Sequence, residues 1–325
     1  MYLLNFVLIF YGKLFLKDRR YMIEPVEQLL KDFPKSQKKP KGMKIIPANF
    51  KNVIIKTYAN EEYTNKKIPL HVHVMIPLKQ YEDHEDQAKY PLLVYIQGSA
   101  WKKQNILEHS ISLSEIAKAG YVVAIVEYRD SSIAPFPAQI EDTKTAITYL
   151  LENRKKYHIQ NDTFFLAGDS SGGHTALMSG ITLNQRIFEN HYFKYADCLK
   201  GVIDLYGPTL VSEMQNEPST QNHISPDSPE GLFLGGVDVL KHQKEAYLAS
   251  PFPYIKKDIY IPPILIMHGN KDRLVPFGQS VLLYEALKEK EKEVDFYQID
   301  NGDHGGAAFW NEEVVSIMID FLNRN

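Results

Sequence analysis

The sequence predicts an α/β fold with a doubly wound, mostly parallel central sheet of about eight strands and helices on both faces. Short apolar runs rich in β-branched residues recur along the chain between glycines and prolines. Such runs are typical of strands that are buried on both faces of a parallel sheet. Helical patterns alternate with these runs, which is the order of a doubly wound fold. Two early segments alternate apolar and polar residues instead, which indicates half-buried antiparallel strands.

Each element can be placed along the chain. The two alternating segments are residues 53–58 and 70–75. The apolar runs that we predict as strands are residues 92–96, 121–126, 163–167, 202–206, 264–267 and 294–299. The segments with helical periodicity are residues 111–119, 138–151, 175–181, 279–290 and 312–322.

Two stretches depart from this alternation. Residues 31–43 are rich in lysine and broken by proline, which is typical of a linker. We therefore predict an N-terminal helical extension and linker over residues 1–45, followed by one domain over residues 46–325. Within that domain, residues 208–255 form a long polar stretch with no strand pattern, which indicates a lid-like functional insertion.

Composition excludes several classes of protein. The net charge is −3, so the chain has no basic field for nucleic acid, and we expect no nucleic-acid partner. A single cysteine, Cys198, cannot form an internal disulfide, and we interpret it as an ordinary core or surface residue. The histidines lack metal-ligand spacing. His71 and His73 would share one face of a strand, but no third ligand is apparent, so we predict no metal.

The sequence allows several roles for the N-terminal residues 1–20. Residues 1–16 are apolar, but the positive charges follow or interrupt this run, so it does not resemble a secretory signal. The run is also shorter than the roughly 20 residues of a membrane-spanning helix. Three interpretations remain for residues 1–20: a helix docked on the body or a partner, a weak membrane-surface anchor, or an extension upstream of a start at Met22. We expect a cytoplasmic location and leave weak membrane association and a homo-oligomer open.

The strongest local signal is the Gly-x-Ser-x-Gly pattern of residues 168–172, centred on Ser170. It follows a predicted strand directly and precedes a predicted helix, which is the setting of a nucleophile elbow. The flanking glycines let neighbouring backbone approach closely. The helix N-terminus then directs its free N–H groups toward a developing oxyanion. We predict that Ser170 is a nucleophile; the alternative is a glycine-rich turn without chemistry.

A nucleophilic serine needs a base, and the base needs an orienting acid. Asp272 and His304 each follow a predicted strand, at the edge of the sheet where ligands bind in open α/β folds. With Ser170 they occur in the order Ser, Asp, His, which the nucleophile elbow also predicts. We therefore predict a triad of these three residues.

The polar residues in and around these motifs allow other interpretations. Asp272 could serve as a helix N-cap, because a proline and a helix follow it. His304 could be an ordinary loop histidine. Asp303 is interpreted as a turn residue. His174 and His268 are interpreted as packing or hydrogen-bonding residues, because neither lies on the loop expected for the base.

The loop after the predicted strand 92–96 supplies candidate oxyanion donors. It reads Gln-Gly-Ser-Ala-Trp over residues 97–101. We predict that the backbone N–H groups of Ser99 and Ala100, together with that of Ser171, form an oxyanion hole. The alternative is an ordinary tight turn. Trp101 is assigned to the substrate pocket, with a place in the core as the alternative.

Together, these motifs resemble those of a known family. From about Pro91 to Trp310 it is similar to the acetyl-esterase and lipase-like branch of the α/β-hydrolases. The closer similarity is to the bifunctional feruloyl and acetyl esterase group, with relatives among kynurenine formamidases. The segments that carry the resemblance are QGSAW, EYRDSSIAPFPAQIED, GDSSGGH, SPEGLFLGG, HGNKDRLVP and NGDHGG.

The resemblance implies an α/β-hydrolase fold and the Ser170–His304–Asp272 triad. It also implies that Tyr128, Arg129 and Asp142 brace the active-site side, with an Arg129–Asp142 pair, and we place Tyr128 beside the substrate pocket. The SPEGLFLGG stretch belongs to the partial lid that shapes the acyl pocket. One departure is that the family usually begins the oxyanion loop with His-Gly-Gly, where this chain has Gln-Gly-Ser at residues 97–99.

The implied activity is that of a serine esterase that cleaves small carboxylic esters. The acyl group is acetyl, another short acyl group or an aryl acyl group. The reaction proceeds through an acyl-enzyme on Ser170. No cofactor is expected, and the expected partner is a small-molecule ester. One alternative keeps the triad but cleaves amides, as a formamidase or small peptidase does. An alternative of another class is a non-catalytic binding protein on a hydrolase scaffold.

Overall fold

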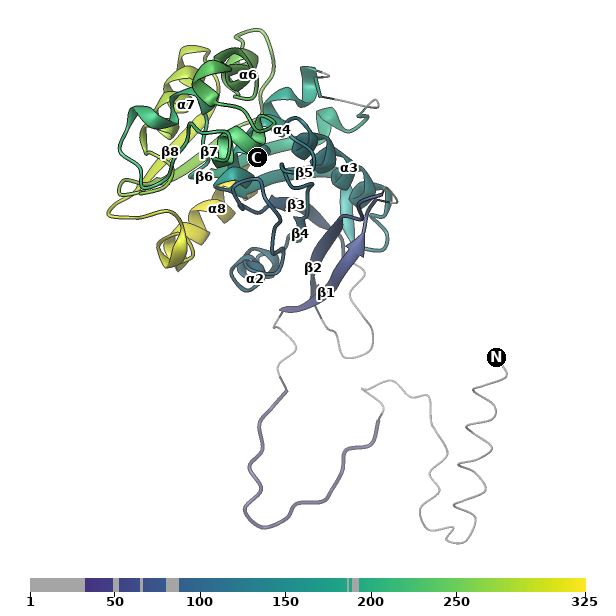
Figure 1. The fold of residues 1–325 in the computed structure, drawn as a ribbon. Coiled ribbons are helices and arrows are strands. Elements are labelled where there is room, and N and C mark those ends of the chain that lie inside the picture. The colour runs from purple at the N-terminus through teal and green to yellow at the C-terminus, as the bar shows by residue number, and fades with distance from the viewer. Residues whose placement is uncertain (1–32, 49–52, 65–66, 80–87, 186, 189–192) are drawn as a thin grey trace. The chain divides into compact units, whose positions relative to one another are not determined.

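The computed structural model describes residues 33–48, 53–64, 67–79, 88–185, 187–188 and 193–325 (Figure 1). The chain divides into two units, Met1–Lys51 with Gln80–Glu85, and Asn52–Lys79 with Asp86–Asn325. The predictions for residues 1–32, including the helical extension and the contacts of residues 1–20, lie outside the described residues. Residues 33–48 contain a turn but neither helix nor strand.

The second unit is built on an eight-stranded sheet with the order β1-β2-β4-β3-β5-β6-β7-β8. Its strands are β1 (Val53–Glu62), β2 (His71–Lys79), β3 (Tyr90–Ile96), β4 (Val122–Val126), β5 (Ile159–Asp169), β6 (Leu199–Leu205), β7 (Ile264–Gly269) and β8 (Val294–Ile299). β1 and β2 run antiparallel to their neighbours, and the other six strands are parallel. The predicted mostly parallel sheet with early antiparallel strands is therefore confirmed.

Five longer helices lie at the predicted places: α2 (Ser110–Lys118), α3 (Ala138–Glu152), α4 (Ser171–Thr182), α7 (Gly278–Glu289) and α8 (Glu312–Arg324). The helix α4 begins four residues before its predicted start at position 175. Its first turn contains two glycines, which carry no side chain to show a helical pattern. Among the described residues, no helix is both long enough and apolar enough to cross a membrane.

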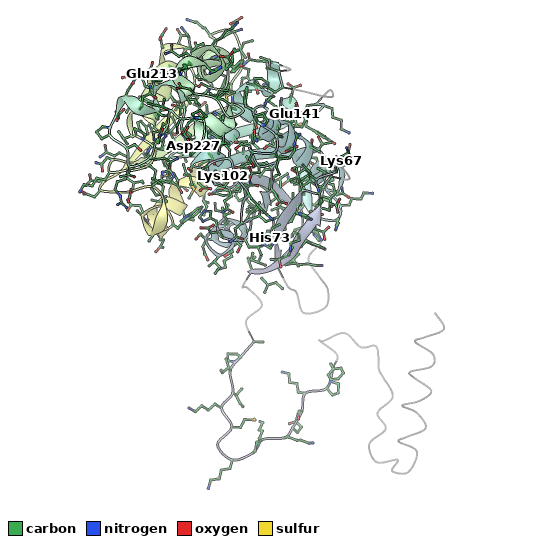
Figure 2. All side chains as sticks on the ribbon, in the orientation of Figure 1. Lys67, His73, Lys102, Glu141, Glu213 and Asp227 are labelled. Carbon is green, nitrogen blue, oxygen red and sulfur yellow. The ribbon has the colours of Figure 1, made fainter. Side chains whose placement is uncertain are left out.

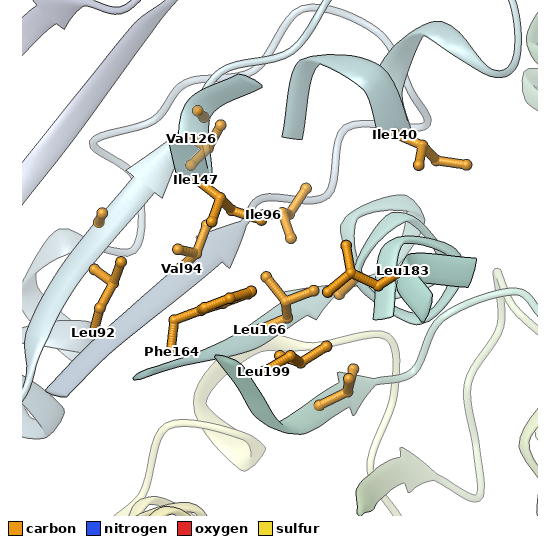
Figure 3. Close-up of a cluster of buried hydrophobic side chains, with 14 of the residues drawn as sticks. Leu92, Val94, Ile96, Val126, Ile140, Ile147, Phe164, Leu166, Leu183 and Leu199 are labelled. Carbon is orange, nitrogen blue, oxygen red and sulfur yellow. The ribbon is translucent and has the colours of Figure 1, made fainter. Parts of the chain in front are cut away.

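Two hydrophobic clusters cover the two faces of the sheet. Leu92 and Val94 of β3 pack in a cluster with residues of α3, α4 and α7, part of which Figure 3 shows. Leu93 and Tyr95 of the same strand pack in the second cluster with residues of α2 and α8. Successive side chains of a strand point to opposite faces. The strand is therefore apolar at every position because helices cover both sides.

A long insertion separates β6 from β7. It contains the short helical elements η5 (Val211–Asn216), α5 (Pro229–Phe233), η6 (Val239–Lys241), α6 (Gln243–Leu248) and η7 (Phe252–Tyr254), and none of its residues is in a strand. Phe233 of α5 stacks on Trp101 in the loop after β3, with ring centroids 4.2 Å apart. In Figure 2, Asp227 of the insertion and Lys102 of the same loop lie close together, and their charges interact. The insertion thus packs on the loop predicted to hold the oxyanion.

The insertion is also bound to the loop after β7. The Thr220 N–H donates to the Arg273 carbonyl over 2.8 Å. The Ser219 hydroxyl donates to the Leu274 carbonyl over 2.9 Å. The His223 ring, which is buried, contacts the same Leu274 carbonyl over 3.1 Å. The insertion is therefore held both to the loop after β3 and to the loop after β7, which flank the candidate site.

Candidate active site

Ser170 lies on a sharp turn between β5 and α4. Its backbone adopts φ 51° and ψ −128°, a region that a residue with a β-carbon rarely enters. The Ser170 N–H donates to the Leu205 carbonyl of β6 over 2.8 Å, which holds the turn in place. A β-carbon on Gly172 would lie 2.0 Å from the Ile96 carbonyl oxygen. Glycine is therefore required there for the helix to start so close to the sheet.

His304 lies between Ser170 and Asp272. Its Nε2 is 2.8 Å from the Ser170 Oγ, and its Nδ1 is 2.7 Å from Asp272 Oδ2. A neutral imidazole that donates from Nδ1 to the carboxylate presents Nε2 as the acceptor for the serine proton. Asp272 follows β7 and His304 follows β8, so both loops leave the same edge of the sheet. The three side chains singled out from the sequence are thus in hydrogen-bonding contact.

The Asp272 carboxylate accepts four hydrogen bonds. Oδ1 accepts from the backbone N–H groups of Leu274 and Val275, over 2.8 and 2.9 Å. Oδ2 accepts from His304 and, over 3.1 Å, from Nε2 of the buried His268. Burial by itself would raise the pKa of Asp272, but the hydrogen bonds from His268 and His304 outweigh it and lower the pKa to about 2. The carboxylate therefore stays charged throughout the neutral range.

This lowered pKa predicts a pH dependence of stability. An unfolded aspartate has a pKa of about 3.9, so Asp272 stabilises the fold above that pH and loses this effect as the pH falls toward 2. By pH 3 the loss should reach about 1 kcal/mol. Urea unfolding at pH 6.5 and pH 3.0 measures it. The wild type should lose about 1 kcal/mol more than Asp272→Asn between these two values, and equal losses would contradict the assignment.

The loop after β3 is held against the serine turn by Ser171. The Ser171 Oγ accepts hydrogen bonds from the Ser99 N–H, over 2.9 Å, and from the Trp101 N–H, over 3.0 Å. The Gly98 N–H donates to Asp169 Oδ1 over 2.9 Å. Two consecutive residues with β-carbons, Ala100 at φ 56° and Trp101 at φ 53°, adopt left-handed backbone. Such a conformation is costly and is typical of functional loops.

These hydrogen bonds bear on the predicted oxyanion hole. The N–H of Ser99 donates to the Ser171 hydroxyl, so it already has an acceptor within the protein. Among the described residues, no hydrogen-bond acceptor contacts the backbone N–H groups of Ala100 and Ser171. The candidate oxyanion donors are therefore Ala100 and Ser171.

Tyr128 lies beneath this loop rather than on the pocket. Its hydroxyl donates to the Gln97 carbonyl over 3.2 Å and lies 3.1 Å from the Ser99 Oγ and 3.4 Å from the Ser171 Oγ. Burial, partly offset by the hydrogen bonds with Ser171 and Ser99, raises the pKa of Tyr128 to about 12. It does not line the cavity described below, so its predicted place beside the substrate is corrected to one that supports the loop.

A cavity of about 320 Å³ opens beside Ser170. The residues that line it include Gly98, Trp101, Ser170, Tyr206, Glu230 and His304. Trp101 is 1% exposed and stacks on Phe233, so it belongs to the core as well as to the cavity lining, and its contact with substrate stays a prediction. The volume lies at the lower end of the range for small-molecule sites.

The residues that flank the motifs have structural contacts. Arg129 Nε lies 2.7 Å from Asp142 Oδ2, which is the pair that the resemblance implied. His174 contacts the Ala249 carbonyl over 2.8 Å, and Asp303 pairs with Arg273 on the surface. Within the described part of the chain, no three His, Cys, Asp or Glu side chains converge as a metal ion would need.

Comparison with known proteins identifies the family. The BD-FAE family model matches residues 78–287. The chain belongs to the BD-FAE family. Esterase LipC of Mycobacterium tuberculosis is 26% identical over 222 residues, which cover 66% of this chain and 53% of that protein. Esterase LipQ of the same organism is 24% identical and covers 71% of this chain and 55% of that protein. The BD-FAE chain therefore spans about half the length of these curated relatives.

A solved structure is similar over most of this BD-FAE chain. It is the truncated form of a carbohydrate esterase from gut microbiota, 27% identical with a TM-score of 0.71. The match covers 86% of this chain and 98% of that chain. The predicted α/β-hydrolase fold and the resemblance to esterases are thereby confirmed.

Three residues at the site of this BD-FAE protein escaped the sequence analysis. Ser171 was noted only for its backbone, whereas its hydroxyl holds the loop. His268 was interpreted as a hydrogen-bonding residue without a stated partner, and it contacts Asp272. Tyr206 ends the predicted strand 202–206 and was interpreted only as part of it, yet it lines the cavity. The His-Gly-x-x-Asp spacing of residues 268–272 could have suggested the second of these contacts.

Replacing Ser171 by alanine should lower ester turnover by roughly 10- to 100-fold. The change removes the acceptor of the Ser99 and Trp101 N–H groups, so the Ala100 N–H loses its fixed direction. A whole oxyanion donor is worth about 10²–10³ in turnover, and a misdirected one loses part of that. Steady-state assays should show the loss in kcat rather than in KM. A Ser171→Ala variant with the kcat of the wild type would exclude this role.

Proposed function

We propose that this BD-FAE protein hydrolyses small carboxylic esters through an acyl-enzyme on Ser170. The observation that carries the proposal is the unbroken chain of contacts from Ser170 through His304 to Asp272, at 2.8 and 2.7 Å. Relatives named as esterases support the class of reaction. The cavity of about 320 Å³ supports a small substrate.

In the first half of the reaction, Ser170 attacks the ester carbonyl carbon while His304 Nε2 takes the serine proton. The Asp272 carboxylate holds Nδ1–H and stabilises the imidazolium that forms. Negative charge develops on the carbonyl oxygen, and the N–H groups of Ala100 and Ser171 stabilise it. The intermediate collapses as His304 gives its proton to the leaving alkoxide, which departs as an alcohol. The acyl group then remains on Ser170.

In the second half, water replaces the alcohol. His304 takes a proton from that water, whose oxygen attacks the acyl carbon. The same N–H groups stabilise the second oxyanion. His304 then returns the proton to Ser170, and the carboxylic acid leaves. Two steps with low barriers thus replace one difficult hydrolysis.

A matched pair of substrates tests the proposal. p-Nitrophenyl acetate and p-nitroacetanilide share the acyl group and the aromatic ring and differ in the bond that is cleaved. We expect turnover of the ester and no measurable turnover of the anilide. Cleavage of the anilide alone would favour the amide-cleaving alternative. If the protein cleaves neither of these two substrates and also cleaves no acetate ester in a series with other alcohols, the result would favour a binding protein on this scaffold.

A further inference from the structure

The hydroxyl of Tyr206 lies at the candidate active site with no partner in the protein. Tyr206 follows β6, is 3% exposed, and lines the cavity beside Ser170. In the described parts of the chain, no backbone or side-chain group forms a hydrogen bond with its hydroxyl. The hydroxyl oxygen is not sealed inside the protein, so water or a bound molecule in the cavity can reach it. A hydroxyl that is accessible from the cavity and has no protein partner therefore points to a ligand group.

The Tyr206 ring is held rigidly beside His304. Its centroid lies 4.8 Å from that of the His304 ring, at 67°, and 4.4 Å from that of Phe309. A β-carbon on Gly305 would lie only 2.8 Å from the Tyr206 hydroxyl oxygen, so glycine leaves room for it. The backbone is fixed too, since the Tyr206 N–H donates to the Met267 carbonyl over 2.8 Å and φ is 46°. The ring is thus held beside the imidazole, and its hydroxyl lies against Gly305, the residue that follows His304.

The hydroxyl is also kept as a hydrogen-bond donor. Burial raises the pKa of Tyr206 well above its ordinary value, and the nearby negative charges of Asp169 and Asp272 raise it further. The phenol therefore holds its proton throughout the pH range in which the triad works.

The position beside His304 indicates which part of an ester the hydroxyl meets. In the proposed reaction, His304 Nε2 must pass its proton to the leaving oxygen, so the departing alcohol lies over the imidazole. The candidate oxyanion donors belong to other elements, Ala100 to the loop after β3 and Ser171 to the start of α4. Resting on the proposed function, we propose that Tyr206 determines specificity for the alcohol: its hydroxyl donates a hydrogen bond to a second oxygen on the leaving group. Esters whose alcohol carries such an oxygen are then favoured.

Two acetate esters of equal length separate this role from a structural one. In 2-methoxyethyl acetate an ether oxygen occupies the place of a methylene in butyl acetate, and that oxygen can only accept. Acetate release, followed by titration at constant pH, gives kcat/KM for both esters. We expect Tyr206→Phe to lower kcat/KM about three- to tenfold for the ether ester, the value of one hydrogen bond, and to leave butyl acetate within twofold.

The Tyr206→Phe variant should fold normally, because the hydroxyl that it loses has no partner in the protein. Its thermal midpoint should match that of the wild type. Tyr128→Phe is the matched control, since the Tyr128 hydroxyl supports the oxyanion loop and does not line the cavity. It should lower kcat/KM for both esters by the same factor.

The outcomes are distinct. A loss confined to the ether ester supports the assignment. Equal effects of Tyr206→Phe on the two esters, or no effect on either, would overturn it while the esterase proposal stands. If the wild type releases acetate from neither ester but cleaves p-nitrophenyl acetate, the Tyr206 assignment falls alone. If it cleaves none of the three, both proposals fall.

Discussion

Replacing Ser170 by alanine should lower the turnover of p-nitrophenyl acetate by about 10⁶-fold, the loss that removal of the nucleophile causes in other serine triads. Alanine keeps the shape of the turn but offers His304 no hydroxyl to deprotonate, so no acyl-enzyme forms. Stopped-flow and steady-state release of nitrophenolate measure the change. The residual rate should reflect only the oxyanion donors and bound water.

A second serine provides the matched control. Ser179 lies on the same helix, α4, is fully buried, and its hydroxyl has no hydrogen-bond partner in the described parts of the chain. Ser179→Ala should leave turnover within twofold of the wild type. If Ser170→Ala retained more than about 1% of wild-type activity, with contamination excluded by purification from a second preparation, another group would have to be the nucleophile.

Replacing Asp272 by asparagine should lower turnover by about 10⁴-fold at neutral pH. The backbone N–H groups of Leu274 and Val275 will keep the amide oxygen on their side. The amide nitrogen then faces His304 Nδ1, which must become an acceptor. The proton moves to Nε2, where it points at Ser170, so the base is lost even though the ring stays in place.

The neighbouring carboxylate is the control for that change. Asp303 precedes His304 directly but pairs with Arg273 on the surface. Asp303→Asn should therefore keep turnover within about threefold, because exposed ion pairs contribute little. If Asp303→Asn and Asp272→Asn lost the same factor of turnover, the negative charge near His304 would determine activity, and the tautomer of His304 would not.

Much of the fold could be predicted from the sequence because the apolar pattern that marks each strand lies within a few consecutive residues. Strands such as β3 and β7 are apolar at nearly every position, since helices cover both faces of the sheet. The candidate triad could be predicted because parallel strands bring their carboxyl ends to one edge of the sheet. Residues that follow separate strands, such as Asp272 and His304, therefore meet although many residues lie between them.

The finer contacts could not be predicted because they depend on side chains that meet across the fold. Nothing local marks the Ser171 hydroxyl as the acceptor for two N–H groups of a loop some 70 residues earlier in the chain. Ser99 is predicted as an oxyanion donor because it lies in the loop whose backbone N–H groups have that role in esterases of this fold. In the structure the Ser99 N–H donates to the Ser171 hydroxyl. The left-handed backbone of Ala100 and Trp101 leaves no trace in the sequence either, because neither residue is glycine.

The central claim is that Ser170 is the nucleophile, and covalent labelling tests it most directly. A fluorophosphonate probe phosphonylates an activated serine and stays attached, so intact mass and peptide mapping locate the bond. We expect one adduct per chain on Ser170, absent in Ser170→Ala and much reduced in His304→Ala. No adduct on the wild type, or an adduct on a different residue, would contradict the claim.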